Sequence, residues 1–272
     1  MKIKSIYFLV LTLQISVNSF AQDNERKFNI HTLAFYNLEN LFDTINDVNK
    51  NDEASPIMEI KFNRSGIYRQ KIRNMAKVIS EIGYEVTKRP PSIIGICEVE
   101  NRKVVEDLIS NEKLENHNYG IVHYESPDDR GIDVGLIFNK DVFEVKNSNS
   151  HDVFITGNNS NKRRNTRDQL VVTGLLDGDL IHIIVNHWPS RGADETKRIA
   201  AAEVNNIIID SLRNIHNNAK IITMGDFNDD PFDKSIKKVL GAKKEIKDVG
   251  KNDFYNPFEK ILVEKGIGTN AY

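Results

Sequence analysis

The sequence has a single cysteine, no long apolar run beyond its first residues, and no excess of basic charge. Because Cys97 has no partner cysteine, an internal disulfide is excluded, and its apolar surroundings predict a buried, inert thiol. A formal net charge of −2 does not indicate a strongly basic nucleic-acid-binding protein. It still allows an enzyme that meets phosphates through a local basic patch and a metal.

The composition is that of an ordinary globular chain, with 39% hydrophobic and 28% charged residues among 272. Internal repeats, linkers and low-complexity tracts are lacking, so one large domain is expected over residues 22–272.

Residues 1–21 have the pattern of a secretory signal peptide. Lys2 and Lys4 form a charged start, Ile6 to Val17 is mostly apolar, and Ser19-Phe20-Ala21 supplies small residues before a cleavage site. We therefore expect a mature chain that begins near Gln22 and lies outside the cytoplasm, secreted or periplasmic. The alternative, a membrane-anchored amino terminus, is disfavoured because the apolar run is too short.

Short apolar runs and helical spacings alternate along the remaining chain. The asparagine-rich segments over residues 44–63 and 147–167 are expected to be loops, and Asp177-Gly178 predicts a hairpin turn. Mixed sheets covered by helices follow from this pattern. The expected strands are 29–35, 92–97, 119–124, 132–138, 170–176, 180–185 and 221–224. The expected helices are 72–82 before Gly83, 104–109 and 199–212, the last burying Ile199, Ala200, Val204, Ile207, Ile208 and Leu212.

The segment Ile221–Asp230 runs from a predicted buried strand into a group of carboxylates and an amide. Asp226 and Asn228 are two residues apart, so an extended backbone would point both to the same side. One could then act as a base or ligand while the other donates a hydrogen bond to the same target. The alternative is an ordinary asparagine- and aspartate-rich turn before Pro231.

Polar residues follow three further apolar strands, namely Asn37 with Glu39, Glu98, and His187. Each alone has an ordinary explanation, since a glutamate can lie in a solvated loop, a histidine can be structural and an asparagine can cap a turn. Because every group comes just after a strand, these side chains can converge at one rim of a sheet sandwich.

These residues resemble the endonuclease/exonuclease/phosphatase superfamily, typified by deoxyribonuclease I and exonuclease III-like enzymes. The resemblance implies an α+β fold, a four-layer α/β/β/α sandwich with the site at one edge of its two sheets. The matching blocks occur in the family's order: Phe35-Tyr36-Asn37-Leu38-Glu39-Asn40, Ile96-Cys97-Glu98-Val99-Glu100-Asn101, Gly131-Ile132-Asp133-Val134-Gly135-Leu136-Ile137-Phe138, Asn186-His187-Trp188-Pro189-Ser190-Arg191 and Gly225-Asp226-Phe227-Asn228.

The resemblance also implies a divalent metal site. Glu98 would be a principal ligand, and Asn37 and Glu39 would complete or support it. The ion expected is Mg²⁺, which takes few carboxylates and several waters, with Mn²⁺ or Ca²⁺ as alternatives.

Catalytic roles are implied for three further residues. His187 would donate to a phosphoryl oxygen, Asp226 would orient and deprotonate the attacking water, and Asn228 would hold the phosphate or that aspartate. The basic cluster over residues 162–167 could contact backbone phosphates or be a solvated loop, and Arg198 could meet phosphate or face solvent. The candidate substrate-binding residues are Asn40, Arg167 and Arg191.

One departure from the family pattern is clear, because its final Asp-His pair has no match and no histidine follows Asp226. Two explanations are open, a fragment of a longer protein or a catalytically impaired copy. The fragment is favoured, because a sandwich without its last strands would expose core and a sheet edge.

The leading hypothesis is a secreted, Mg²⁺-dependent endonuclease that hydrolyses DNA or RNA phosphodiesters and acts as a monomer. A sphingomyelinase-like enzyme or an inositol-phosphate phosphatase would share the same central residues. A binding module that keeps the sandwich without catalysis is the reading from another class of protein.

Overall fold

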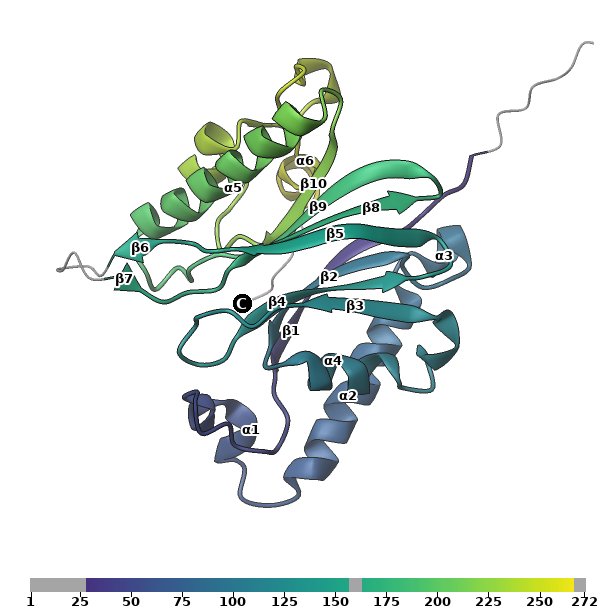
Figure 1. Ribbon diagram of the computed structural model, residues 1–272, viewed down its shortest axis with the longest axis vertical. Coiled ribbons are helices and arrows are strands. Elements are labelled where there is room, and N and C mark those ends of the chain that lie inside the picture. Colours follow the sequence, from purple (N-terminus) through teal and green to yellow (C-terminus); the bar gives the residue numbers. More distant parts are fainter. Residues whose placement is uncertain (1–27, 157–162, 267–272) are drawn as a thin grey trace, which may run out of the picture. The chain divides into compact units, whose positions relative to one another are not determined.

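The computed structural model describes residues 28–156 and 163–266, shown in colour in Figure 1. The signal peptide expected at residues 1–21 lies outside these ranges. The chain divides into Met1–Ile30 and a compact unit, His31–Tyr272, which contains both sheets and their helices. Within the described ranges, no helix combines the length and apolar composition needed to cross a membrane.

The first sheet has four strands with the only parallel pairing between its first two. The order is β1 (Leu33–Leu41), β2 (Ile93–Val99), β4 (Asp133–Asn139) and β3 (Tyr119–His123). Polar residues at the ends of β1 and β2 consequently reach the same edge of this sheet.

The second sheet repeats this plan, with one parallel pair followed by antiparallel neighbours. The turn between β8 and β9 is formed by Asp177 and Gly178 at φ 48° and 87°, as the Asp-Gly signal predicts. The order is β10 (Lys220–Asp226), β9 (Asp179–His187), β8 (Gln169–Leu176) and β5 (Phe143–His151), and two small ribbons pair β6 (Ile155–Thr156) with β7 (Arg163–Arg164) and β11 (Ala242–Lys243) with β12 (Phe254–Tyr255).

The two sheets pack face to face over an apolar core. Cys97, Leu136, Val172 and Ile183 from both sheets are fully buried in this layer. The predicted buried thiol is confirmed, and burial raises the pKa of Cys97 well above its usual value. A neutral thiol of this kind contributes as a small apolar side chain.

Helices cover the outer faces of both sheets, which completes the four layers (Figure 1). On the first sheet, α2 (Arg64–Glu81) and α4 (Arg102–Ile109) bury Met75, Ile79 and Leu108. On the second, α5 (Glu195–Ile215) and the π-helix η3 (Ser235–Val239) cover Ile184. The expected α/β/β/α sandwich is confirmed. The remaining helical elements are η1 (Asp52–Ala54), α1 (Pro56–Glu59), α3 (Tyr84–Thr87), η2 (Glu115–His117), η4 (Ile246–Asp248) and α6 (Pro257–Lys265).

Two expectations about strands were wrong. Residues 143–151, partly assigned to a polar loop, form edge strand β5, because pairing with β8 outweighs the weak β-propensity of Asn and Ser. The first strand begins at Leu33 rather than Asn29 and continues through Asn37, Glu39 and Asn40 to Leu41.

Two burial expectations also fail. The strand over residues 221–224 is half-buried, because β10 is an edge strand of its sheet. In α5 the buried face is rotated, so Ile207 is 69% exposed while Ala201 and Ala202 are buried.

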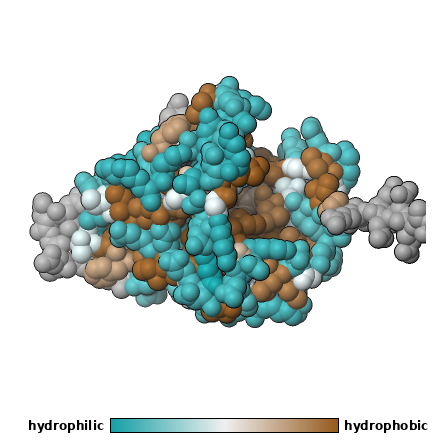
Figure 2. All heavy atoms as spheres, turned by 90° about the horizontal axis from the view of Figure 1, so that it is seen from above, coloured by the Kyte–Doolittle hydropathy of each residue, from teal (hydrophilic) through white to brown (hydrophobic). Residues whose placement is uncertain are grey.

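On the face shown in Figure 2, apolar residues are interspersed with polar ones.

Candidate active site

Glu98 sits on a β-bulge in the middle strand of the first sheet. Cys97 pairs with Val134 and Val99 with Asp133, so Glu98 is an extra residue without a partner in β4. Its φ is 58°, a left-handed conformation that is costly for a residue with a side chain. The bulge takes Glu98 out of the regular alternation of β2.

Backbone strain is concentrated around Glu98. Among the described residues, eight non-glycine residues have positive φ, and four of them are Glu39, Asn40, Glu98 and Asn228. Such conformations cost on the order of 1–3 kcal/mol each and persist where the surrounding structure enforces them. Their clustering marks these strand ends as a functional site.

The side-chain amide of Asn37 joins the two sheets. Its Nδ2 donates to Glu98 Oε1 and to Asp226 Oδ2, both at 3.1 Å, while its Oδ1 accepts from the backbone N–H of Glu39 at 2.7 Å. Two carboxylates that would repel each other therefore share one donor group. In this orientation Asn37 offers nitrogen, so it acts as a bridge between the carboxylates.

The second oxygen of Glu98 is held from β1. Glu98 Oε2 accepts from the backbone N–H of Asn40 at 2.9 Å. Lys71 of α2 in turn donates to the carbonyls of Glu39 and Asn40, the latter at 3.0 Å. Burial lowers the pKa of Lys71, and the charges of Glu39 and Glu98 act against that effect. Lys71 could not be identified from the sequence, because a lysine on an amphipathic helix gives no signal of its own.

His187 and Asp226 face each other across the parallel β9–β10 ladder. The residues before them approach closely, because a Cβ on Gly225 would meet Asn186 O at 2.3 Å, which only glycine avoids. His187 is buried, with Nε2 3.6 Å from Glu98 Oε1, and among the described residues its Nδ1 has no hydrogen-bond partner. Burial, followed by the charges of Arg167 and Arg130, lowers its pKa well below the usual value, so this imidazole is neutral at pH 7.

Asn228 reaches Asp226 through a turn. Its backbone N–H donates to Asp226 Oδ1 at 3.0 Å with φ at 51°, and its Nδ2 donates to the carbonyl of Trp188 at 3.0 Å. The expectation that an extended backbone aligns the two side chains was wrong, and the alternative asparagine turn is present. This turn holds Asp226 in place.

Glu98, His187 and Asp226 could hold a metal ion, since each offers one ligand atom and these atoms lie within 4.8 Å of one another. Two carboxylates and an imidazole nitrogen suit a divalent cation. Glu39 is not a member of this group; its residue is exposed and its backbone, rather than its carboxylate, makes the contacts.

A second group, His123, Glu125 and Asp133, also has metal-ligand geometry. Its buried aspartate is already satisfied, because Asp133 accepts from Ser126 N–H and Oγ at 2.8 and 2.7 Å and contacts His123 Nε2 at 3.1 Å. Lys50 lies 3.9 Å from Glu125 and disfavours a further cation. These contacts indicate a structural role that fixes the β3–β4 loop.

The structure places the predicted arginines in ion pairs. Arg191 contacts Asp230 at 2.8 Å and Asp233 at 3.1 Å, and it also donates to the Asn228 carbonyl. Arg198 is buried, and its Nε lies 2.5 Å from Asp229 Oδ1. The alternative that Arg198 faces solvent was therefore wrong.

Arg167 is buried as well. It donates to the carbonyl of Trp188 at 2.5 Å and contacts Asp128 at 3.4 Å. Of the surrounding basic cluster, Lys162 lies outside the described residues, and Asn165 donates to Asp129 at 2.9 Å. In this structure Arg167 and Arg191 make side-chain contacts within the protein, and Asn40 makes backbone contacts within it. The substrate contacts expected for these three residues remain predictions.

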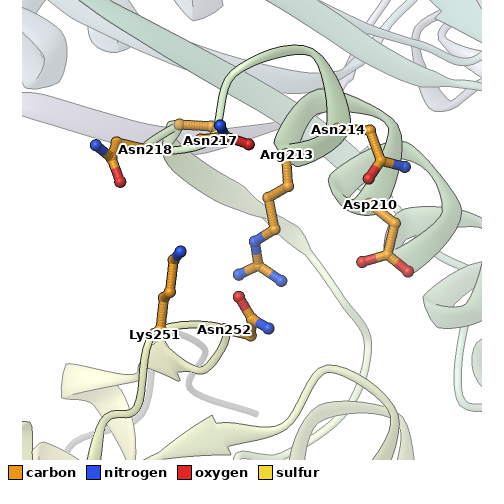
Figure 3. A pocket seen from close by; sticks show the side chains of 8 residues that line it. Asp210, Arg213, Asn214, Asn217, Asn218, Lys251 and Asn252 are labelled. Atoms are coloured by element: carbon orange, nitrogen blue, oxygen red, sulfur yellow. The ribbon is translucent and has the colours of Figure 1, made fainter.

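A cavity of about 500 Å³ lies at the start of β10, whereas Asp226 is at its end (Figure 3). Its lining is polar, with Arg213, Asn214 and Lys251 among the side chains shown. None of the candidate catalytic or metal-binding residues lines it. The candidate active site is instead the group of Glu98, His187 and Asp226 at the opposite end of β10.

The fold and the site together define a class. A four-layer sandwich whose strand ends unite two carboxylates, a histidine and two asparagines is the arrangement that the sequence blocks led us to expect for metal-dependent phosphoesterases. Residues 32–272 match the model of the Endonuclease/Exonuclease/phosphatase family. The chain belongs to this family, which is one of phosphoesterases.

Solved structures agree on the fold. A conserved protein of unknown function from Enterococcus faecalis V583 superposes with a TM-score of 0.52 at 14% identity, over 78% of this chain and 73% of that one. ANGEL2, described as a 2',3'-cyclic phosphatase, also gives 0.52 at 14% identity, over 78% of this chain and 56% of its own. None of the curated proteins compared with the chain matches it significantly.

The human Nocturnin catalytic domain is a third similar structure, at 21% identity and a TM-score of 0.46 over 62% of this chain. The match covers 63% of that domain, so the chain spans less than two thirds of both Nocturnin and ANGEL2.

Proposed function

We propose that this protein is a divalent-metal-dependent hydrolase of nucleic-acid phosphodiester bonds. The observation that carries the proposal is the meeting of Glu98, His187 and Asp226 within 4.8 Å at the strand ends of two sheets. Asn37 donates to both carboxylates, and Asn228 donates to the other oxygen of Asp226. Together with a divalent cation, carboxylates, a neutral imidazole and amides can bind a phosphodiester and activate water.

Glu98 would be the principal ligand of the cation, and Mg²⁺ is the ion proposed because it uses few protein carboxylates. A bound divalent cation offsets the negative charge that grows on the phosphoryl oxygens. Asn37 keeps the two carboxylates apart at a fixed spacing. Glu39 contributes through its backbone in this structure, and its carboxylate remains a predicted support for the metal.

We assign His187 the role of donating a hydrogen bond to a phosphoryl oxygen of the substrate. Because burial and nearby arginines keep its ring neutral, one nitrogen carries a proton and can donate a hydrogen bond. Asp226 is assigned the attacking water, which it orients and deprotonates in line with the leaving oxygen. Asn228 fixes one oxygen of Asp226 through its backbone N–H, leaving the aspartate directed at the shared space.

The test is nicking of supercoiled plasmid by the purified protein with Mg²⁺ and with EDTA. We expect activity that needs the metal and that falls on the order of a hundredfold or more in Glu98→Gln and in Asp226→Asn. Glu125→Gln, in the second carboxylate group, is the matched control and keeps its activity. Mg²⁺ should also raise the melting temperature of the wild type but not of Glu98→Gln, which reports binding independently of turnover.

Two results would contradict this assignment. Equal activity in wild type, Glu98→Gln and Asp226→Asn would show that these residues do not form the active site. Cleavage of a phosphocholine lipid or an inositol phosphate without cleavage of nucleic acid would move the proposal to that substrate class. Metal binding without hydrolysis of any of these would support the binding-module hypothesis.

We also propose that the protein acts outside the cytoplasm. The support is the charged start and short apolar run of residues 1–21. Fractionation of cells that express the whole chain, with sequencing of the amino terminus, tests this. A product that starts near Gln22 in the extracytoplasmic fraction is expected, and uncleaved protein in the cytoplasm would contradict it.

A further inference from the structure

Arg130 lies on the β3–β4 loop at the edge that carries the candidate active site. The loop leads into Asp133, which pairs with Val99, the residue directly after Glu98. A side chain on this loop therefore starts beside the strand end that supplies the main proposed metal ligand.

The loop is firmly held. Asp129 accepts from the Asn51 N–H through its carbonyl at 2.8 Å and from the Asn165 amide through its side chain at 2.9 Å. Asp133 fastens the other part of the loop through Ser126. A group presented from such a support loses little additional freedom when it binds a ligand.

Arg130 itself is aimed by a buried carboxylate. Asp128 accepts from Arg130 Nε at 3.1 Å, from its Nη2 at 3.2 Å and from its backbone N–H at 3.0 Å. The same carboxylate contacts Arg167 at 3.4 Å. One negative charge thus lies between two guanidinium groups, which leaves a net positive charge next to the site.

Arg130 retains donor capacity beside its pairing with Asp128. Half of its side chain is exposed (52%), and in the part of the chain that the structure describes its Nη1 has no hydrogen-bond partner. Arg167 and Arg198 are buried, and Arg191, which is equally exposed (51%), is paired with two carboxylates, Asp230 and Asp233. Of these two exposed arginines, Arg130 is paired with fewer carboxylates and is therefore the better placed to meet an anion.

Arg130 is linked to the reacting groups indirectly. Asp128 connects it to Arg167, Arg167 donates to the Trp188 carbonyl, and the same carbonyl accepts from Asn228. This chain of contacts connects Arg130 to the Asn228 turn of the proposed reaction centre, without a direct contact to Glu98 or Asp226.

We propose that Arg130 binds an anionic group of the substrate other than the phosphorus under attack, namely a phosphate flanking the cleaved linkage of a nucleic-acid strand. This inference rests on the proposed function and makes Arg130 a specificity residue. It predicts that a substrate with several phosphates is preferred over one with a single phosphodiester, because a guanidinium recognises phosphate through paired donors.

The experiment compares wild type, Arg130→Ala, Arg130→Lys and the matched surface variant Arg102→Ala, whose guanidinium pairs with Glu106 on α4. KM and kcat are measured on a short single-stranded DNA oligonucleotide and on a dinucleotide with one phosphodiester. We expect Arg130→Ala to raise KM for the oligonucleotide about tenfold with kcat nearly unchanged, and to leave the dinucleotide unaffected. Arg130→Lys should fall between, and Arg102→Ala should match wild type.

Binding of a fluorescein-labelled oligonucleotide, measured by anisotropy in EDTA, separates this inference from the proposed function. Arg130→Ala should bind about tenfold more weakly, with the slope of log affinity against log salt reduced by about one. If Arg130→Ala binds the oligonucleotide more weakly but wild type does not hydrolyse it, the binding role of Arg130 is supported and the proposed function is contradicted. Unchanged oligonucleotide binding and KM, no detectable binding by wild type, or an equal loss on the dinucleotide would overturn the inference. Melting temperatures of all variants exclude a folding defect as the cause.

Discussion

Asn37 of β1 donates a hydrogen bond to Asp226 of β10 at 3.1 Å, so a residue of one sheet holds a carboxylate of the other. The same amide donates to Glu98 at 3.1 Å, and it is the link between the two halves of the site described above. Without this donor, the two carboxylates would lose the one hydrogen-bonding group that they share, which offsets part of their repulsion.

Replacing Asn37 by alanine should therefore reduce plasmid nicking on the order of a hundredfold, because both carboxylates lose their shared donor. The melting temperature should change little, since Asn37 is only half-buried. Asn217→Ala, an exposed asparagine at the other end of β10, serves as the control. Wild-type activity in Asn37→Ala would show that the bridge has no part in catalysis.

Lys71→Met should weaken metal binding without removing any proposed ligand. Lys71 holds the carbonyls of Glu39 and Asn40, and the N–H of Asn40 holds Glu98. Loss of such an outer contact commonly costs a factor of about 10–100 in metal affinity. The measurement is the Mg²⁺ concentration for half-maximal activity, with Lys77→Met on the exposed side of α2 as control; equal values for the two variants would contradict the expectation.

Asp128→Asn should destabilise the fold in a pH-dependent way. Burial alone raises the pKa of Asp128, but hydrogen bonds and charge from Arg130 and the charge of Arg167 outweigh it, so its pKa lies below the usual value. A lowered pKa contributes stability that is present above the unfolded value of about 3.9 and is lost as the pH falls through the folded value.

At pH 7 we expect Asp128→Asn to lose on the order of 3 kcal/mol, because Arg167 would be left buried without its partner charge. The difference from wild type should narrow below about pH 4. Urea unfolding over this pH range measures both effects, and Asp129→Asn on the exposed side of the loop is the control. A difference that is constant with pH would rule out the ionised carboxylate as its source.

Gly225→Ala should distort the β9–β10 ladder next to His187 and Asp226. The added Cβ would meet Asn186 O at 2.3 Å and Asn186 Cβ at 2.6 Å, and backbone atoms cannot move aside cheaply. Overpacking of this kind costs about 1–3 kcal/mol, seen as a lower melting temperature together with lost activity. Gly192→Ala is the control, because its nearest atom is Ser190 Oγ at 3.7 Å; equal melting temperatures in the two variants would contradict the prediction.

The sequence predicted much of this architecture because its signals are local. Apolar runs identified β2, β4, β8 and β9, helical spacing identified α2 and α5, and Asp-Gly identified the hairpin. Strand β5 escaped, since Asn- and Ser-rich residues extend only through pairing with β8. The exposure of Ile207 escaped because the buried face of a helix depends on how it rotates against the sheet.

The site was predictable to a similar extent. Glu98, His187 and Asp226 could be found because each follows an apolar strand, and the structure brings them together. Lys71 and Asp128 could not be assigned, because their roles arise from contacts between segments distant in sequence. The Asn228 turn was open to two interpretations, and only the left-handed backbone decides between them.

The division of the site between two sheets has a mechanical consequence. His187 and Asp226 are joined through one hydrogen-bonded ladder, whereas Glu98 is carried by the other sheet. The gap between Glu98 and Asp226 therefore depends on the offset of the two layers. Apolar contacts between the sheets, such as Met224 against Gly95, hold that offset.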